Sequence, residues 1–381
     1  MTAGEALLDA FINANILFVI CFALWLVVRA ILNGLGLRHA VGTQLKLLNL
    51  LFVAVAGAPI VAGAFRAMQN TGVTPKMNVN LSDAIVAHYL NGGFQMDSSK
   101  FETLVLLRDN FVRDLLNVQG IVAQAVIAVF LLGLAIGLLR LIWSVICLWR
   151  IVGDSYHWRD FGRLKLRVSD RTMVPFSTRG LQNYYVVVPS HMLSESAELQ
   201  VALTHELQHI RQGDLTWEMT LEALKPLFFL NPAYHAWKRQ VEHLRELNCD
   251  NEVLLNGRID VRSYCETLLS VCQKTLRRDR VFILAVPKVT LVTADRSTLF
   301  DKKRSFLEQR IHSALASRRT RFQNLLFTGI SIPLLVATTL TTLAIQSPGD
   351  WSHDRLMLST VVNLDRLDEI NKLSAFGQVR Q

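Results

Sequence analysis

The chain has 381 residues, of which 51% are hydrophobic and 19% are charged, and a formal net charge of +9. A soluble protein of this length would ordinarily fold into two or three domains with a larger charged share. The composition therefore excludes a wholly soluble protein and indicates one that is partly buried in a membrane.

Four long runs without a charged residue point the same way. A helix of about 20 apolar residues crosses a bilayer core of about 30 Å, and each run is close to that length or longer. The runs cover residues 10–28, 47–65, 115–139 and 322–349. We therefore expect an α-helical integral membrane protein with four transmembrane helices.

The distribution of basic residues predicts the orientation. The first 28 residues contain two acidic residues but no lysine or arginine, which argues against a cleaved signal peptide. Arg29, Arg38 and Lys46 follow the first apolar run, and residues 150–321 carry 27 basic and 19 acidic residues. Because basic loops stay in the cytoplasm, we expect both termini outside and residues 150–321 inside.

This orientation divides the chain into six segments. They are two transmembrane helices with a short cytoplasmic turn (1–66), an extracytoplasmic loop (67–114), a third transmembrane helix (115–149), a cytoplasmic domain (150–321), a fourth transmembrane helix (322–346) and an extracytoplasmic tail (347–381). Apolar residues recur every three or four positions over 101–116, which predicts a helix that packs on the tail, the membrane surface or a partner. We expect a signal to enter through this loop, the alternative being a passive connector.

The basic excess lies almost wholly in the expected cytoplasmic segment, so attraction to the anionic lipid bilayer explains it. No helix-turn-helix or aromatic-basic RNA motif occurs, and we expect no direct nucleic-acid binding. None of the five cysteines lies in an expected extracytoplasmic segment. A disulfide framework is therefore not expected, and the cysteine spacing does not suggest a zinc ribbon.

Within the cytoplasmic domain, local patterns predict one strand and several helices. The β-branched and aromatic run 184–188 predicts a short strand, which we expect at a sheet edge because Pro189 ends it. A helix should begin near Ser194, whose side chain would cap it. A helical stretch over 215–230 is interrupted at Pro226, and Pro232 suits the first turn of another long helix, 232–255.

The strand offers a place for a substrate. An extended peptide can add to an exposed strand edge by backbone pairing, which here would use Tyr185, Val186, Val187 and Val188. The alternative is an internal strand with both edges already covered.

Two histidines four residues apart indicate the chemistry. The segment His205-Glu206-Leu207-Gln208-His209 has the pattern H-E-x-x-H, and Asp214 follows one turn later. Histidines at this spacing share one helix face, so both imidazoles can reach one Zn²⁺ while Glu206 takes a proton from water. We expect a zinc site, the alternative being histidines that serve only as surface or core residues.

A catalytic zinc needs a third protein ligand. Glu242, Glu246 and Asp250 lie four apart on the helix 232–255 and share a face, and His243 is a further candidate. Asp250 could instead orient a zinc-bound histidine. The plain alternative is a solvated helix whose acidic residues pair with neighbouring lysine and arginine side chains.

Three segments carry a family resemblance: residues 202–210 around the histidines, Asn231-Pro232, and 245–250 (Arg-Glu-Leu-Asn-Cys-Asp) followed by Val253-Leu254. They resemble the antirepressor membrane metallopeptidases, typified by the BlaR and MecR sensor-transducers of beta-lactam resistance. The glutamate-x-x-x-aspartate pattern formed by Glu246 and Asp250 also resembles the one in the HtpX and CAAX-prenyl-protease metallopeptidases. The layout resembles the family over roughly residues 1 to 345, and 306–311 resembles its short helix before the last membrane crossing.

The resemblance implies a gluzincin-like zinc endopeptidase in a bacterial cytoplasmic membrane, with a mainly helical α+β zincin-type domain inserted between the third and fourth helices. It makes His205, His209 and Glu246 the zinc ligands, Glu206 the general base, and Asp250 the residue that orients a ligand. It is also compatible with a homodimer.

The residue that stabilises the oxyanion is left open. Four residues are suitable by type: Tyr234, His235, His243 and Arg245. Of these, we single out His243 and Arg245. We expect a signal-responsive protease that cleaves a protein substrate in the cytoplasm, such as a transcriptional repressor. The alternatives are an HtpX-like quality-control protease of membrane proteins and an inactive signalling scaffold. The tail has no Ser-x-x-Lys motif, so direct beta-lactam sensing is not expected.

Overall fold

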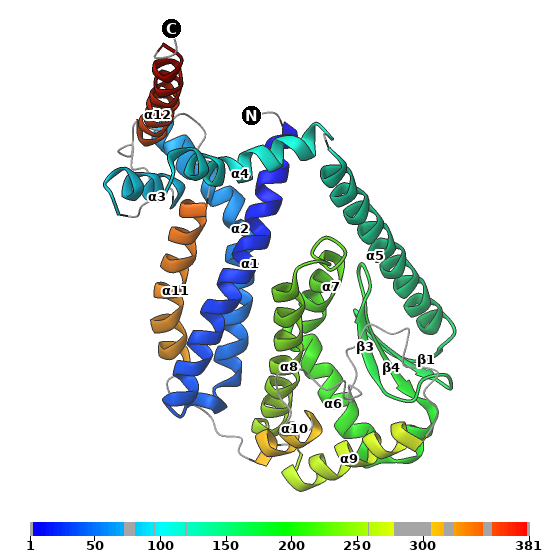
Figure 1. Cartoon of the computed structure of the whole chain (residues 1–381). Coiled ribbons are helices and arrows are strands. Elements are labelled where there is room, and N and C mark those ends of the chain that lie inside the picture. The colour runs from blue at the N-terminus through cyan, green and yellow to red at the C-terminus, as the bar shows by residue number, and fades with distance from the viewer. Residues whose placement is uncertain are drawn as a thin grey trace. The chain divides into compact units, whose positions relative to one another are not determined.

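The computed structural model describes residues 3–71, 81–93, 96–118, 120–257, 259–277, 306–315, 323–345 and 353–378 (Figure 1). The chain forms two compact units, each built from separated segments. The first comprises Met1–Leu24, Leu50–Leu131 and Gly329–Gln381, and the second comprises Trp25–Asn49 and Leu132–Thr328. The segments 278–305 and 316–321 of the expected cytoplasmic domain lie outside the described residues, as does residue 322.

Among the residues that the structure describes, four helices are long and apolar enough to cross a bilayer, as the sequence predicts. They are α1 (Ala3–Gly34), α2 (Val41–Asn70), α5 (Ile121–Gly153) and α11 (Gln323–Ile345), with the short 3-10 turn η1 (Leu37–His39) between the first two. The third starts at Ile121 rather than at residue 115. Val118 and Gly120 have positive φ angles of 54° and 84°, so the chain turns there and a separate helix precedes α5.

That preceding helix belongs to a small helical cluster in the first unit. It consists of α3 (Leu81–Leu90), α4 (Ser98–Leu116) and α12 (His353–Gln378). Val86, Phe101, Leu358 and Val362 form its buried core, and the Ser98 hydroxyl donates to Asp365 at 2.5 Å. The helix predicted over 101–116 is therefore present, and of the three surfaces considered for it, it packs on the tail.

The second unit contains a four-stranded mixed sheet in the order β1-β2-β4-β3. Its strands are β1 (Tyr156–Phe161), β2 (Leu164–Ser169), β3 (Phe176–Arg179) and β4 (Tyr184–Pro189). The strand predicted at 184–188 exists, but its expected place at an edge is wrong. β4 pairs in parallel with β2 on one side and antiparallel with β3 on the other, because the chain returns through a hairpin to cover its second edge.

Helices pack against the sheet and against each other. After the sheet, the second unit continues with a short 3-10 helix and several α-helices. They are η2 (Ser190–Ser194), α6 (Ser196–Gln212), α7 (Asp214–Leu224), α8 (Pro232–Leu255), α9 (Val261–Arg277) and α10 (Phe306–Leu315). One core cluster joins Val186 and Val188 of β4 to Ala202 of α6 and Leu268 of α9. This packing holds α6 between the sheet and the later helices.

Two helix starts differ in how they are built. Ser194 does not cap α6, because its hydroxyl donates to the His191 carbonyl at 2.9 Å, and Glu195 occupies the cap position without a side-chain bond. The start of α8 is capped as its sequence predicts, since Asn231 Oδ1 accepts from the backbone N–H groups of Ala233 and Tyr234 and Pro232 follows it. The predicted bounds 232–255 are confirmed.

Candidate active site

The two histidines of α6 face each other inside the second unit. His205 is 0% exposed and His209 is 1% exposed, and their Nε2 atoms lie 3.1 Å apart. Because the residues are one helical turn apart, both rings project from the same side of α6. Two buried imidazole nitrogens at this separation can share one cation.

A carboxylate from α8 meets the same point. Glu246 Oε2 lies 3.6 Å from His205 Nε2, and Glu246 Oε1 lies 3.6 Å from His209 Nε2. One side chain therefore contacts both rings, each with a different oxygen. Two nitrogen donors and one carboxylate thus converge on one buried point.

The opposite nitrogen of each ring is engaged separately. His209 Nδ1 lies 2.8 Å from Asp214 Oδ2, and His205 Nδ1 lies 3.0 Å from the Tyr264 hydroxyl. That hydroxyl donates to Asp250 Oδ1 at 2.5 Å, and the same oxygen is 3.4 Å from His205 Nδ1. Partners of this kind fix ring orientation and leave Nε2 facing the shared point.

Cys249 lies next to the same histidines, and its sulfur forms a compact group with His205 and His209. Its position differs from that of Glu246. The Sγ atom is 3.6 Å from His205 Nδ1 and donates to the His205 carbonyl oxygen at 3.5 Å. Burial, with the nearby Asp250 carboxylate, raises the pKa of the Cys249 thiol well above its ordinary value.

Glu206 is fully buried beside the histidines. Its Oε2 accepts from the Ser177 hydroxyl of β3 at 2.6 Å, whereas Oε1 has no hydrogen-bond partner among the residues that the structure describes. Burial raises the pKa of Glu206 from 4.5 to about 7, against the lowering effects of His209 and of the Ser177 hydrogen bond. A carboxyl with such a pKa can accept and return a proton near neutral pH.

Glu246 and Asp250 share a buried arginine from α10. Arg310 is 2% exposed, donates to both oxygens of Asp250 at 2.7 and 2.6 Å, and places Nη1 3.3 Å from Glu246 Oε2. Burial alone would raise the pKa of Glu246, but the close approach of His205 and the charges of His209 and Arg310 hold it well below its ordinary value. Glu246 is thus kept as a carboxylate.

Several expected site residues lie elsewhere. Arg245 is buried and donates to Glu218 Oε2 of α7 at 2.6 Å, so it is not free to stabilise an oxyanion as we expected. His243 is half-buried and packs its ring on Phe306 of α10, with centroids 5.0 Å apart. Glu242 turns to Lys238 rather than to the histidines.

The residues expected to bind substrate on β4 are inside the fold. Val186, Val187 and Val188 are each 0% exposed, and Tyr185 pairs with Lys165 of β2 and with Thr178 of β3. A peptide therefore cannot add to this strand, and the alternative of an internal strand is confirmed.

Besides Asp214 and Cys249, which lie close in sequence to the predicted residues, three further residues that contact the site were not predicted as site residues. Ser177 comes from β3, Tyr264 from α9 and Arg310 from α10, and they contact residues 29, 59 and 60 positions away in the chain. No short spacing could reveal them. For Arg310 alone a signal existed, since its segment resembles a helix of the family.

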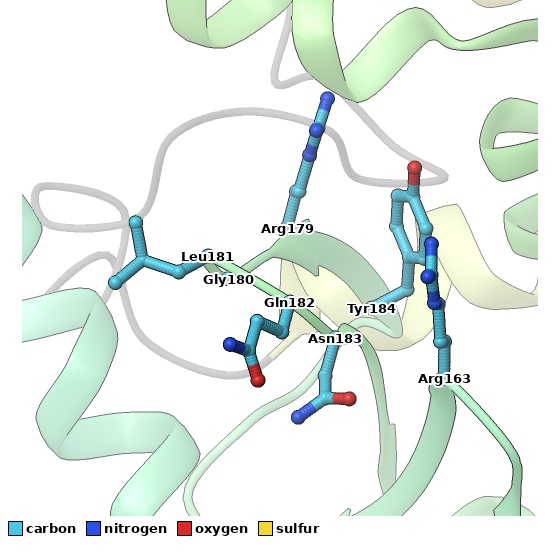
Figure 2. A pocket seen from close by; sticks show the side chains of 7 residues that line it. All are labelled: Arg163, Arg179, Gly180, Leu181, Gln182, Asn183 and Tyr184. Carbon is cyan, nitrogen blue, oxygen red and sulfur yellow. The ribbon is translucent and has the colours of Figure 1, made fainter.

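A cavity of about 420 Å³ lies at the turn between β3 and β4, away from the histidines. Figure 2 shows Arg163 and Arg179 extending to the same side of this turn with Tyr184 between them. Arg179 donates to the Thr216 hydroxyl of α7 at 2.5 Å and lies over the Tyr184 ring. Arg179 lies two residues beyond Ser177 on β3, whereas Arg163 comes from the turn between β1 and β2.

Comparison with known proteins supports a peptidase. The model of the family described as BlaR1 peptidase M56 matches residues 7–290, which include most of α1, all of α2 to α9 and every candidate site residue except Arg310. The comparison with curated proteins gives no match. Because the matched segment covers most of the chain and contains the paired histidines, the chain belongs to the BlaR1 peptidase M56 family.

Proposed function

We propose that the protein is a membrane zinc endopeptidase whose metal is held by His205, His209 and Glu246. The observation that carries this proposal is the convergence of two imidazole Nε2 atoms and one carboxylate at a buried point. Membership of a peptidase family supports the reaction class, and imidazole and carboxylate donors suit Zn²⁺.

The residues present fit a cation. Glu206 Oε1 is buried and has no hydrogen-bond partner in the described part of the chain, and Glu246 Oε2 has no hydrogen bond there beside its ion pair with Arg310 at 3.3 Å. A buried carboxylate oxygen that is incompletely satisfied is costly unless a further group completes it. The histidines present Nε2 to this point because Asp214 and Tyr264 occupy their other nitrogens. A cation would satisfy these donors together.

Glu246 is a better third ligand than Cys249. The carboxylate lies on the Nε2 side of both rings, whereas the sulfur lies on the Nδ1 side of His205, where it already bonds to a backbone carbonyl. A cation bound between the Nε2 atoms would therefore meet Glu246 first. We propose that Cys249 packs behind the site.

The proposed reaction is hydrolysis of a peptide bond. A bound zinc ion would supply Lewis acidity for the scissile carbonyl and lower the pKa of a water molecule. Glu206 accepts the proton of that water and delivers it to the leaving amine. The Ser177 hydroxyl holds one Glu206 oxygen, so the other is directed to the reacting groups.

We propose that substrate pairs with β3, which takes the place we expected for β4. The Gly180 N–H donates to the Asn183 carbonyl at the hairpin end, so the alternation of an antiparallel pair turns the backbone groups of Ser177 and Arg179 away from β4. A peptide bonded there would pass beside Glu206. β3 is the edge strand on this side of the sheet.

The biological role we propose is signal-dependent cleavage of a cytoplasmic regulator, with both termini outside and the peptidase domain inside. The support is the BlaR1-type family and the basic excess in residues 150–321. The second candidate function is quality control of membrane proteins, the role expected of an HtpX-like protease. Proteomics on cells with the wild type or Glu206→Gln separates them, because one accumulated protein indicates a regulator, many indicate quality control, and none contradicts both.

A further inference from the structure

The turn that joins α7 to α8 is apolar and projects from the fold. Residues 225–231, which we call the tip segment, read Lys-Pro-Leu-Phe-Phe-Leu-Asn. Leu230 is 63% exposed and Leu227 is 37% exposed. Connections in water are usually polar, so a run of five apolar residues in such a turn calls for an apolar environment.

The tip segment packs on α5 at two glycines one helical turn apart. A Cβ atom built on Gly133 would lie 2.1 Å from Cζ of Phe229, and one built on Gly137 would lie 3.0 Å from Cβ of Pro226. Side chains at these two positions would collide with the tip segment. The Phe229 ring and Pro226 therefore pack directly against the backbone of α5.

The position of these glycines along α5 places the contact within the bilayer. α5 has 33 residues, and its only charged residues are Arg140 and Arg150. About 20 helical residues cross the bilayer core, and every stretch of that length within α5 contains Gly137. Wherever the membrane boundary falls, Pro226 lies at a depth occupied by lipid chains.

Hydrogen bonds within the protein satisfy several backbone groups of the tip segment and of the end of α7, which lowers the cost of placing them in hydrocarbon. The His235 ring nitrogen Nε2 lies 2.9 Å from the Phe229 carbonyl oxygen, and the Tyr234 hydroxyl donates to the Leu221 carbonyl. The backbone N–H groups of Leu227 and Asn231 donate to Leu224 and Phe228. These hydrogen bonds are independent of the glycine contacts and are compatible with the same placement.

The one charged residue of the tip segment does not oppose this placement. Lys225 Nζ lies 3.5 Å from Glu222, and a lysine stem can lie along apolar surface while its ammonium group reaches a polar boundary. Further along the hairpin, Lys238 is paired with Glu218, Glu222 and Glu242. Charges on the two helices thus neutralise each other.

We propose that the tip segment inserts among the lipid acyl chains beside α5, as a wedge that anchors the peptidase domain in the bilayer. The domain between the third and fourth membrane helices is then not wholly aqueous, as we had expected from the sequence. Glu246 lies 14 residues after Pro232, about 21 Å along α8. The wedge therefore fixes the metal site at a set distance from the membrane, whatever its substrate.

Spin labels test this placement. Leu230→Cys and Leu227→Cys, each the sole cysteine in the full-length chain, are labelled with a nitroxide in phosphatidylethanolamine and phosphatidylglycerol vesicles. Collision rates with oxygen, which concentrates in lipid, and with a water-soluble nickel chelate are then compared. The lipid reference is Val129→Cys, 57% exposed on α5, and the water reference is Arg262→Cys, whose side chain is 86% exposed on α9.

We expect the ratio of oxygen to nickel collisions at both tip positions to match that at position 129 and to exceed that at 262 several-fold. A ratio like that at 262 would overturn the proposal, and so would low collision rates with both reagents, which would mean protein covers the tip. A photo-crosslinking amino acid at position 230 in a chain with its native cysteines gives a second readout. Lipid adducts support the wedge, and their absence where position 129 forms them contradicts it.

Discussion

The Ser177 hydroxyl donates a 2.6 Å hydrogen bond to Glu206 Oε2, and both groups are buried. This bond joins β3 to the helix that carries both histidines. It lowers the pKa of Glu206, which burial raises to about 7. The hydroxyl thus both holds the proposed base and keeps it ionised to a lower pH.

Replacing this hydroxyl should slow the reaction and change its pH dependence. Hydrogen bonds to charged groups contribute about 1.5–3 kcal/mol, so Ser177→Ala should lower kcat about tenfold or more. Glu206 acts as a base only when deprotonated, so the acidic limb of kcat/KM should move to higher pH. Ser177→Thr keeps the hydroxyl and should keep the wild-type profile. An unshifted limb in Ser177→Ala, at unchanged zinc content, would count against Glu206 as the base.

The two candidates for third ligand can be separated by substitution. Glu246→Gln should weaken zinc binding strongly, because the amide replaces a carboxylate that contacts both rings. Cys249→Ser should leave zinc affinity close to that of the wild type. Competition with a chromogenic chelator measures both. The opposite pattern would assign the metal to Cys249.

Arg310 should be needed for stability as well as for the site. It is the guanidinium between Asp250 and Glu246, and removing one partner of a buried ion pair costs about 3–5 kcal/mol. Arg310→Gln should therefore lower the Tm markedly, and Asp250→Asn in the same chain should restore part of it. Arg262→Gln, at an exposed pair on α9, is the matched control and should change the Tm little. Equal Tm values for the two single variants would contradict this role.

The hairpin of α7 and α8 should lose stability in acid through Glu218. Burial alone would raise the pKa of Glu218, but Arg245 and Lys238 outweigh it and hold the pKa below 4.5. A carboxylate with a lowered folded pKa stabilises the fold above its unfolded pKa, and this contribution is lost as pH falls through the folded pKa. In metal-free protein, Glu218→Gln should lower the Tm at pH 7, and the difference should shrink below pH 4. A constant difference would refute the linkage.

The proposed substrate strand can be tested at the end of β3. Proline at position 179 removes the N–H that points away from β4 while leaving the β4 ladder intact. Arg179→Pro should lower kcat/KM several-fold beyond the effect of Arg179→Ala, which removes the same side chain but keeps the N–H. Identical values for the two variants would exclude backbone pairing at this residue.

Local features of the sequence predict individual helices and strands better than they predict which of these elements contact one another. The start of α8 follows from Asn231 and Pro232, because a helix cap is set by adjacent residues. The strand at 184–188 was also predictable, but its burial was not, since β2 pairs with it from 20 positions away and the hairpin to β3 covers its other edge. Likewise, the spacing of His205 and His209 predicts that they meet, whereas Tyr264 and Arg310 come from helices whose docking no local pattern encodes.

The zinc content of purified protein tests the central proposal most directly. We expect about one zinc per chain in the wild type and in Glu206→Gln, and loss of that zinc in a His205→Ala/His209→Ala double variant that keeps its fold. Both imidazoles face the same point, so no other pair of nitrogens on α6 could replace them. Stoichiometric zinc in the folded double variant would contradict the assignment of the metal to this site.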